Sequence, residues 1–218
     1  MRLKDGNTNI TIAGIWNPAI LNPHWLAANI FDVAEGQNEP VQIEFAPVGG
    51  VPPRFTLRGT MFIPSRERLI VQPAQVNDNS LDAVEAAAKR ILERLPHTPL
   101  IGIGCNFSFV EEAPGPEQLE PFSRGVFDLA ALSFEFEITE RSTTSALAFD
   151  GHILNLTQTL QNNQVTIDFN FHYASGSAIE AAARLRSPNG IFRQNFYKAR
   201  GVLHELYHFE LQPEEVQQ

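Results

Sequence analysis

The stretch HELYH at 204–208 has the residue types and spacing of a metal site. His204 and His208 are four residues apart, so on a helix both imidazoles lie on one face. Glu205 follows the first histidine, where a carboxylate can take a proton from a metal-bound water. A catalytic zinc ion needs three protein ligands and one open position. The stretch supplies two of those ligands, and the third must come from elsewhere in the chain.

HELYH resembles the active-site helix of zinc-dependent metallopeptidases, and the resemblance covers these five residues and little around them. It implies a zinc-dependent hydrolase in which His204 and His208 bind the metal and Glu205 is the catalytic base. Most families with this motif take the third ligand from well downstream of the helix. The acidic residues that follow here are Glu210, Glu214 and Glu215. This short tail leaves the third ligand unknown.

A ligand from upstream is the other arrangement, as in peptide deformylases, where a cysteine precedes the helix. Cys105 would be the analogue, but the glycine-rich and cysteine-flanking motifs of that family are missing. Cys105 also alternates with Ile103 and Phe107 on the apolar face of a predicted strand. Since free cysteine is among the most buried residue types, we predict a buried thiol rather than a ligand.

The helix predicted for 191–211 gives a second test of the motif. On a helical wheel, the apolar side chains form one stripe: Phe192, Phe196, Ala199, Leu203, Leu206 and Tyr207. His204 lies at the flank of this stripe, whereas Glu205 and His208 lie toward the opposite side. We therefore expect the motif to point away from the surface that the helix buries. Histidines near the C-terminal end also stabilise a helix without any chemistry.

Asp168 and His172 form a second candidate site. They share the polar face of the strand predicted for 165–173, the apolar residues of which form the other face. This polar face is either a ligand-binding wall or solvent-exposed surface. A small-molecule-binding domain with Asp168 and His172 as ligand-binding residues is therefore a further alternative.

Composition excludes several kinds of partner. The 218 residues carry a formal net charge of −9, which repels a phosphate backbone, so we expect no nucleic-acid partner. No apolar run is long enough to cross a membrane, and we expect no membrane partner. A single cysteine and the lack of a signal peptide at the start predict a cytoplasmic protein.

Hydrophobic periodicity predicts the elements. Period-two alternation indicates strands at 10–15, 41–48, 55–63, 68–72, 100–110, 132–140, 145–150, 152–160 and 165–173. Helical periodicity and capping residues indicate helices at 23–31, 80–95, 177–186 and 191–211. Asn22 is the expected N-cap of the first helix, Asn79 or Ser80 of the second, and Ser177 of the third.

These elements predict an α+β protein with a mainly antiparallel sheet, helices packed on one face and a C-terminal helix. It has two similarly ordered halves, each with strands followed by a helix. The first is 1–110, with the helix at 80–95. An acidic, proline-rich loop at 111–127 connects it to the second, 128–218, and the two can form one continuous domain.

The leading hypothesis is a non-catalytic protein-interaction or assembly module without a cofactor, which binds a protein partner or itself. Its basis is the long sheet-forming segments, because the edges of a sheet must be covered or paired. The alternative is a zinc-dependent hydrolase or peptidase with zinc at HELYH.

Overall fold

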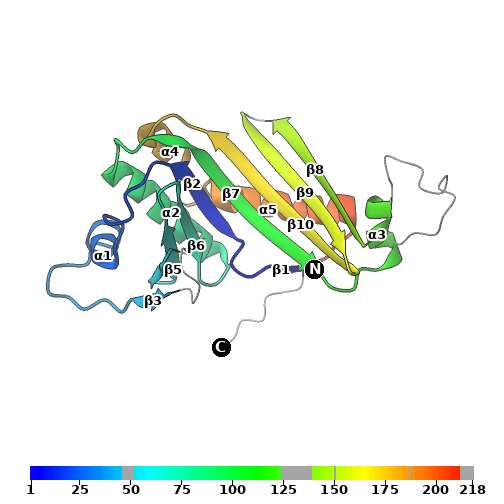
Figure 1. Cartoon of the computed structure of the whole chain (residues 1–218), viewed down its shortest axis with the longest axis horizontal. Helices are drawn as coiled ribbons and strands as arrows, with labels where there is room; N and C mark the ends of the chain where they lie inside the picture. The colour runs from blue at the N-terminus through cyan, green and yellow to red at the C-terminus, as the bar shows by residue number, and fades with distance from the viewer. Residues whose placement is uncertain (46–51, 124–138, 150, 187, 212–218) are drawn as a thin grey trace.

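The computed structural model describes residues 1–45, 52–123, 139–149, 151–186 and 188–211. Within these ranges ten strands form one antiparallel sheet, and five helices accompany it (Figure 1). The predicted α+β class with an antiparallel sheet and a C-terminal helix is confirmed. A single sheet runs through both predicted halves.

The strands before residue 100 are β1 (Arg2–Leu3), β2 (Asn9–Gly14), β3 (Gln42–Glu44), β4 (Arg54–Leu57), β5 (Thr60–Pro64) and β6 (Arg68–Pro73). The later strands are β7 (Leu100–Glu111), β8 (Glu140–Phe149), β9 (His152–Gln161) and β10 (Gln164–Ala174). Their order across the sheet is β3-β4-β5-β6-β2-β7-β10-β9-β8, and β1 pairs with the end of β7. The edge strands are therefore β3 and β8.

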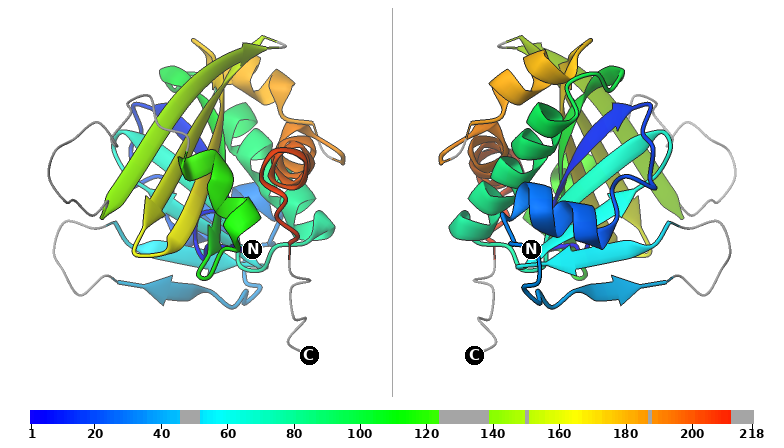
Figure 2. Two further views of the ribbon diagram at one scale, coloured as in Figure 1. Left: turned by 90° about the vertical axis from the view of Figure 1, so that its right-hand side faces the viewer. Right: turned by 90° about the vertical axis from the view of Figure 1, so that its left-hand side faces the viewer.

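The helices are α1 (Pro23–Ile30), α2 (Asp78–Arg94), α3 (Pro116–Ser123), α4 (Ala178–Arg184) and α5 (Ile191–Tyr207). Figure 2 shows α2, α4 and α5 on one face of the sheet, and we call the other side the open face. None of the described helices is long and apolar enough to span a membrane.

The core lies between the helices and the sheet, and phenylalanine rings fill much of it. Phe107 on β7 stacks on Phe192 of α5, with ring centroids 5.2 Å apart, and Phe196 lies 5.6 Å from the same ring. Phe109 meets Phe169 of β10 edge to face at 5.8 Å. Burying one such ring stabilises the fold by about 2 to 3 kcal/mol. These contacts fix α5 on the centre of the sheet.

The two halves repeat the same order of elements. When β7 is counted with the second half rather than with the first, the order β2, α1, β4, β5, β6, α2 is matched by the order β7, α3, β8, β9, β10, α4. The spatial order repeats as well, with β4-β5-β6-β2 matching β8-β9-β10-β7. β2 and β7 pair with each other at the middle of the sheet. In this correspondence β3 is an addition to the first half, next to β4.

Helix caps explain where the helices begin. The Asn22 side chain accepts a hydrogen bond from Trp25 N at 3.0 Å, which confirms the first predicted cap. α2 begins two residues earlier than predicted, because Asn77 is its N-cap and exchanges hydrogen bonds with Ser80 in a capping box. Ser177 Oγ accepts from Glu180 N at 3.2 Å and caps α4 as predicted.

The prediction of one strand at 55–63 is wrong, because this segment folds into the hairpin of β4 and β5. Arg58 and Gly59 both have positive φ, 47° and 73°, as a tight two-residue hairpin turn requires. The turn shifts the inward-facing positions from odd to even numbers: Phe55 and Leu57 are buried before it, and Thr60 and Phe62 after it. Met61 and Ile63 are nevertheless apolar, so the odd-numbered alternation continues in the sequence. The sequence pattern therefore does not show the reversal.

Two further predictions, of a strand and of a loop, differ from the structure. Within the described part of the strand predicted at 41–48, β3 covers only Gln42–Glu44, and the supposed inward residues Ile43 and Phe45 are 46% and 76% exposed; 46–48 lies outside the described residues. The segment 111–127, predicted to be a loop, contains α3, while 124–127 lies outside the described residues. Most of the strand predicted at 132–140 also lies outside them.

Candidate interaction surface

The structure places the HELYH residues at the exposed end of α5. The helix ends at Tyr207, and His208 is its C-cap in a left-handed conformation, with φ 56°. His204, Glu205 and His208 are all exposed, as the helical wheel predicted. His204 Nε2 lies 3.9 Å from Glu210 Oε1. Because His208 has left the helical path, the spacing of four does not give the geometry of two ligands on a continuous helix.

No group of three or more His, Cys, Asp or Glu side chains that could hold a metal ion occurs among the described residues. Glu214 and Glu215 lie outside them. Cys105 is fully buried on the helix-facing side of β7, as predicted, and burial raises the pKa of its thiol well above the usual range. The described residues thus offer His204 and His208 no third ligand.

Asp168 and His172 lie on the open face of β10, both half-buried, on either side of Asn170. The register places Asp168 between Ser108 of β7 and Thr157 of β9. His172 lies beside Gly104 of β7 and Ile153 of β9, so one cross-strand row of the open face, that of Asn170, separates the two candidates. The two hollows described at the surface lie elsewhere; one, of about 370 Å³, lies between α2 and α4.

A row of four asparagines crosses the open face between the two candidate residues. Asn155 of β9 donates to Asn170 of β10 at 2.9 Å, and Asn170 donates to Asn106 of β7 at 2.7 Å. Asn106 in turn donates to Asn9 of β2 at 2.9 Å. A side chain at Gly104 would collide with this row, since a Cβ there would lie 2.7 Å from Asn170 Nδ2. The row fixes the register of four strands.

Pairs of hydroxyl groups continue the open face to the edge of the sheet. Ser142 of β8 lies 3.2 Å from Thr159 of β9, and Thr144 lies 3.0 Å from Thr157, oxygen to oxygen. On this edge strand Ser142, Thr144, Ala146 and Ala148 face the open side. The face is thus polar but carries little charge.

Sequence reasoning predicted part of β8, as a strand at 145–150, but missed its full length and its place at the edge of the sheet. Its ten residues pair with β9 without a bulge, and no described strand pairs with its outer side. From Ser142 to Ala148 it contains neither charged residues nor proline, and Leu147 is 47% exposed. Proteins usually protect sheet edges with charges, prolines, bulges or short strands. β8 has none of these along its middle.

The opposite edge of the sheet is protected. β3 is three residues long and carries Glu44, and it covers the outer side of β4 in antiparallel pairing. In the repeated topology β4 corresponds to β8. A signal for this contrast is present in the sequence, because ERSTTSALAF is rich in small and β-branched residues and has charges only at its start.

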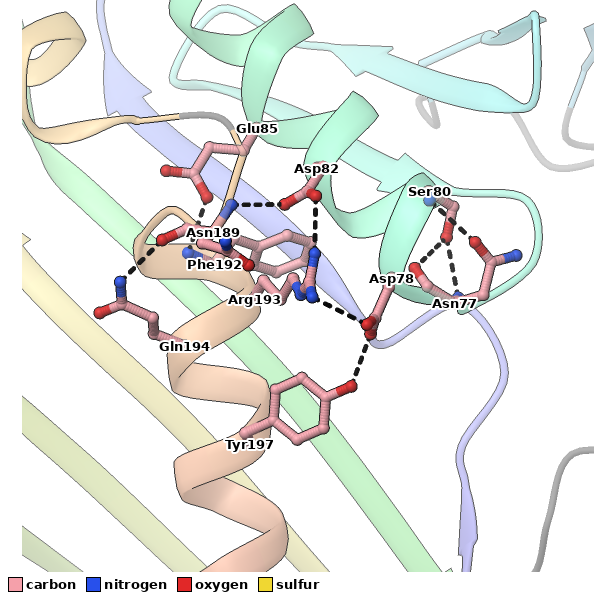
Figure 3. A network of polar contacts seen from close by, with 10 residues as sticks. All are labelled: Asn77, Asp78, Ser80, Asp82, Glu85, Asn189, Phe192, Arg193, Gln194 and Tyr197. Atoms are coloured by element: carbon pink, nitrogen blue, oxygen red, sulfur yellow. Dashed lines mark hydrogen bonds and ion pairs between the residues drawn. The ribbon is translucent and has the colours of Figure 1, made fainter.

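A row of acidic side chains on α2 holds the start of α5, as Figure 3 shows. Glu85 is fully buried and accepts hydrogen bonds from three backbone N–H groups, those of Arg186, Ile191 and Phe192, at 2.7 to 3.0 Å. This carboxylate caps the N-terminus of α5 from another helix, where negative charge is favoured. Burial nevertheless raises the pKa of Glu85 to about 7, against the effect of those hydrogen bonds.

Asp78 and Asp82 continue this row toward the surface. The Arg193 guanidinium lies 2.8 Å from Asp82 and 2.9 Å from Asp78, and the Tyr197 hydroxyl donates to Asp78 at 2.6 Å (Figure 3). The three acidic residues are spaced 78, 82 and 85, which places them on one side of α2. Their partners on α5 make the row a structural contact between helices rather than a site open to a substrate.

A small polar cluster also lies inside the core, between α5 and the sheet. Asn195 of α5 donates to the Tyr173 hydroxyl at 2.7 Å, and both are buried. Burial raises the pKa of Tyr173 to about 12. The His152 ring stacks on Tyr173 with centroids 4.8 Å apart. Asn195 and Tyr173 thus satisfy each other by a hydrogen bond inside the core, beside the His152 ring.

The sequence was also compared with known proteins. No protein-family model and no curated protein matches it.

Proposed function

We propose that the chain is a non-catalytic assembly module that associates with itself. The observation that carries the proposal is the bulge-free edge strand β8, which is uncharged from Ser142 to Ala148, in a sheet that is protected at its other edge. Backbone N–H and C=O groups along such an edge are free to pair with another strand. The exposed position of His204 and His208 adds no competing chemistry that the described residues complete. The single cysteine supports a reducing compartment, and we propose the cytoplasm.

Size-exclusion chromatography with light scattering, from about 1 to 200 µM chain, tests this function. We expect a mass that rises with concentration from the 24.3 kDa of one chain toward twice that value. The dissociation constant should fall in the micromolar range, because a strand pair alone gives a small interface. A constant mass of one chain over the whole range would refute self-association.

Metal analysis separates this proposal from the zinc-dependent alternative. The chain is purified without metal-affinity resin and its zinc content is measured, with His204→Ala as the matched variant. We expect no stoichiometric zinc in either protein. One zinc per chain that disappears in His204→Ala would favour the hydrolase instead.

A further inference from the structure

The fold indicates the direction in which a partner strand would pair with the outer side of β8. The other half of the fold shows which direction is favoured, because β3 covers the equivalent strand β4 in antiparallel pairing. The central strands β2 and β7 pair antiparallel as well. A strand that is added to β8 antiparallel would therefore repeat contacts that the fold already makes twice.

A second copy of β8 is a compatible partner strand. The charged residues Glu140 and Arg141 lie at one end, and the strand is uncharged from Ser142 to Ala148. Antiparallel overlap along the strand thus places no like charges opposite one another, even though the whole chain carries −9. The small side chains at the centre, such as Thr144, also allow two strands to approach at the normal distance of about 4.8 Å.

Symmetry fixes which residues would meet. In one continuous sheet with all helices on the same side, the two-fold axis is perpendicular to the sheet, and residues opposite each other share a face. Even-numbered residues of β8 in one copy then pair with even-numbered residues of β8 in the other. The residue on the two-fold axis therefore lies opposite the same residue of the second copy. An axis at Thr144 places Glu140 opposite Ala148 and Ser142 opposite Ala146, and nearly the whole strand overlaps. An axis at Ser145 gives the only comparable overlap.

We infer that two copies of this chain pair β8 with β8 about a two-fold axis at Thr144 or Ser145. This inference rests on the proposed self-association and adds its site and symmetry. The two ten-stranded sheets become one sheet, and the hydroxyl pairs Ser142–Thr159 and Thr144–Thr157 of each copy lie along the junction. The polar open face then continues across both copies.

Charge swapping at the axis tests the inference. Thr144→Lys and Thr144→Glu each place like charges opposite one another in their own homodimer, whereas the mixture pairs Lys with Glu. We expect each variant alone to raise the dissociation constant by about twofold to fivefold. In an equimolar mixture, heterodimers should exceed the statistical half. Native mass spectrometry with one variant labelled with nitrogen-15 counts the three species, and the same pair of substitutions at Ser145 covers the second register.

The matched control is the same pair of substitutions at Gln42 on the opposite edge strand β3, which is also exposed. There we expect a wild-type dissociation constant and statistical mixing. Circular dichroism and melting temperature confirm that each variant is folded, as the exposure of Thr144 leads us to expect. A wild-type dimer that mixes statistically in both the Thr144 and Ser145 pairs overturns β8 pairing but leaves self-association intact. A monomeric wild type overturns both.

Discussion

At the scale of single residues, the side chains with the most contacts in the fold are not the ones that belong to a recognisable sequence motif. His204 and His208 match a known pattern, yet both are exposed, and the helix ends at Tyr207, before the second histidine. Glu85 matches no pattern, yet it is fully buried and joins two helices. The sequence could show that Glu85 lies on α2. It could not show that the start of α5 folds back onto it, because that contact spans about a hundred residues.

Glu85 makes stability depend on pH. Its pKa rises from 4.5 in the unfolded chain to about 7 in the fold, so its contribution is complete below 4.5 and is lost as pH rises through 7. We expect the free energy of unfolding to fall by about 3 kcal/mol from this group between pH 4.5 and 8. Urea titrations across that range should show this slope in wild type and not in Glu85→Gln. Asp82→Asn, which keeps Glu85, is the control, and an equal slope in Glu85→Gln would contradict the assignment.

Gly190 is required by the same contact. A Cβ at this position would lie 2.0 Å from Glu85 Oε1 and 1.8 Å from the Arg186 carbonyl oxygen. We expect Gly190→Ala to destabilise the protein by about 2 to 4 kcal/mol. Gly201→Ala, inside α5 with no atom within 4 Å of the added Cβ, should instead stabilise by up to about 1 kcal/mol. Thermal denaturation of both variants measures the difference, and equal effects would show that crowding by Glu85 is not the cause.

At the scale of elements, strong hydrophobic periodicity predicted the strands and their buried faces, whereas weak periodicity did not predict the short elements. The alternation in β7 and β10 correctly predicted buried faces, including Phe107 and Phe169. Ile101 is an exception: it is 71% exposed, because the pairing of β7 with β2 shifts register beside it. Short elements such as α3, and the turn at Arg58, depend on local backbone conformation that alternation does not encode.

The asparagine row is the element-level device that holds β2, β7, β10 and β9 in register. Asn170 occupies its middle and makes two of its hydrogen bonds. We expect Asn170→Ala to cost about 1 to 3 kcal/mol, because it removes both bonds and leaves amide groups on Asn106 and Asn155 without these partners. Thr166→Ala, on the same face of the same strand, should cost less than about 1 kcal/mol. Urea denaturation compares the two, and equal losses would mean that the two hydrogen bonds of Asn170 do not contribute to stability.

At the scale of the whole molecule, one sheet joins the two similar halves. β2 pairs with β7 at the centre, and α5 packs on both β7 and α2. Alternation along each strand predicted the strands but not their order, because pairing partners are set by contacts far apart in sequence. The candidate edge β8 became visible only when that order placed it outermost.

This arrangement predicts a single unfolding transition. Trp16 and Trp25 both lie in the first half, so tryptophan fluorescence reports that half, whereas far-ultraviolet circular dichroism reports both. We expect the two signals to change at the same urea concentration, measured at a protein concentration low enough to keep the chain monomeric. Separate transitions would instead mean that the halves fold as independent domains.

The repeated order of elements also bears on ancestry. β2 and β7 occupy equivalent places in the two halves and pair with each other antiparallel. A polypeptide of half this length, with one such strand at its edge, could form the same central pair by meeting an identical molecule. Joining two genes for that polypeptide would turn the contact between subunits into the middle of one chain. The sheet would then record an ancient dimer, made permanent by fusion.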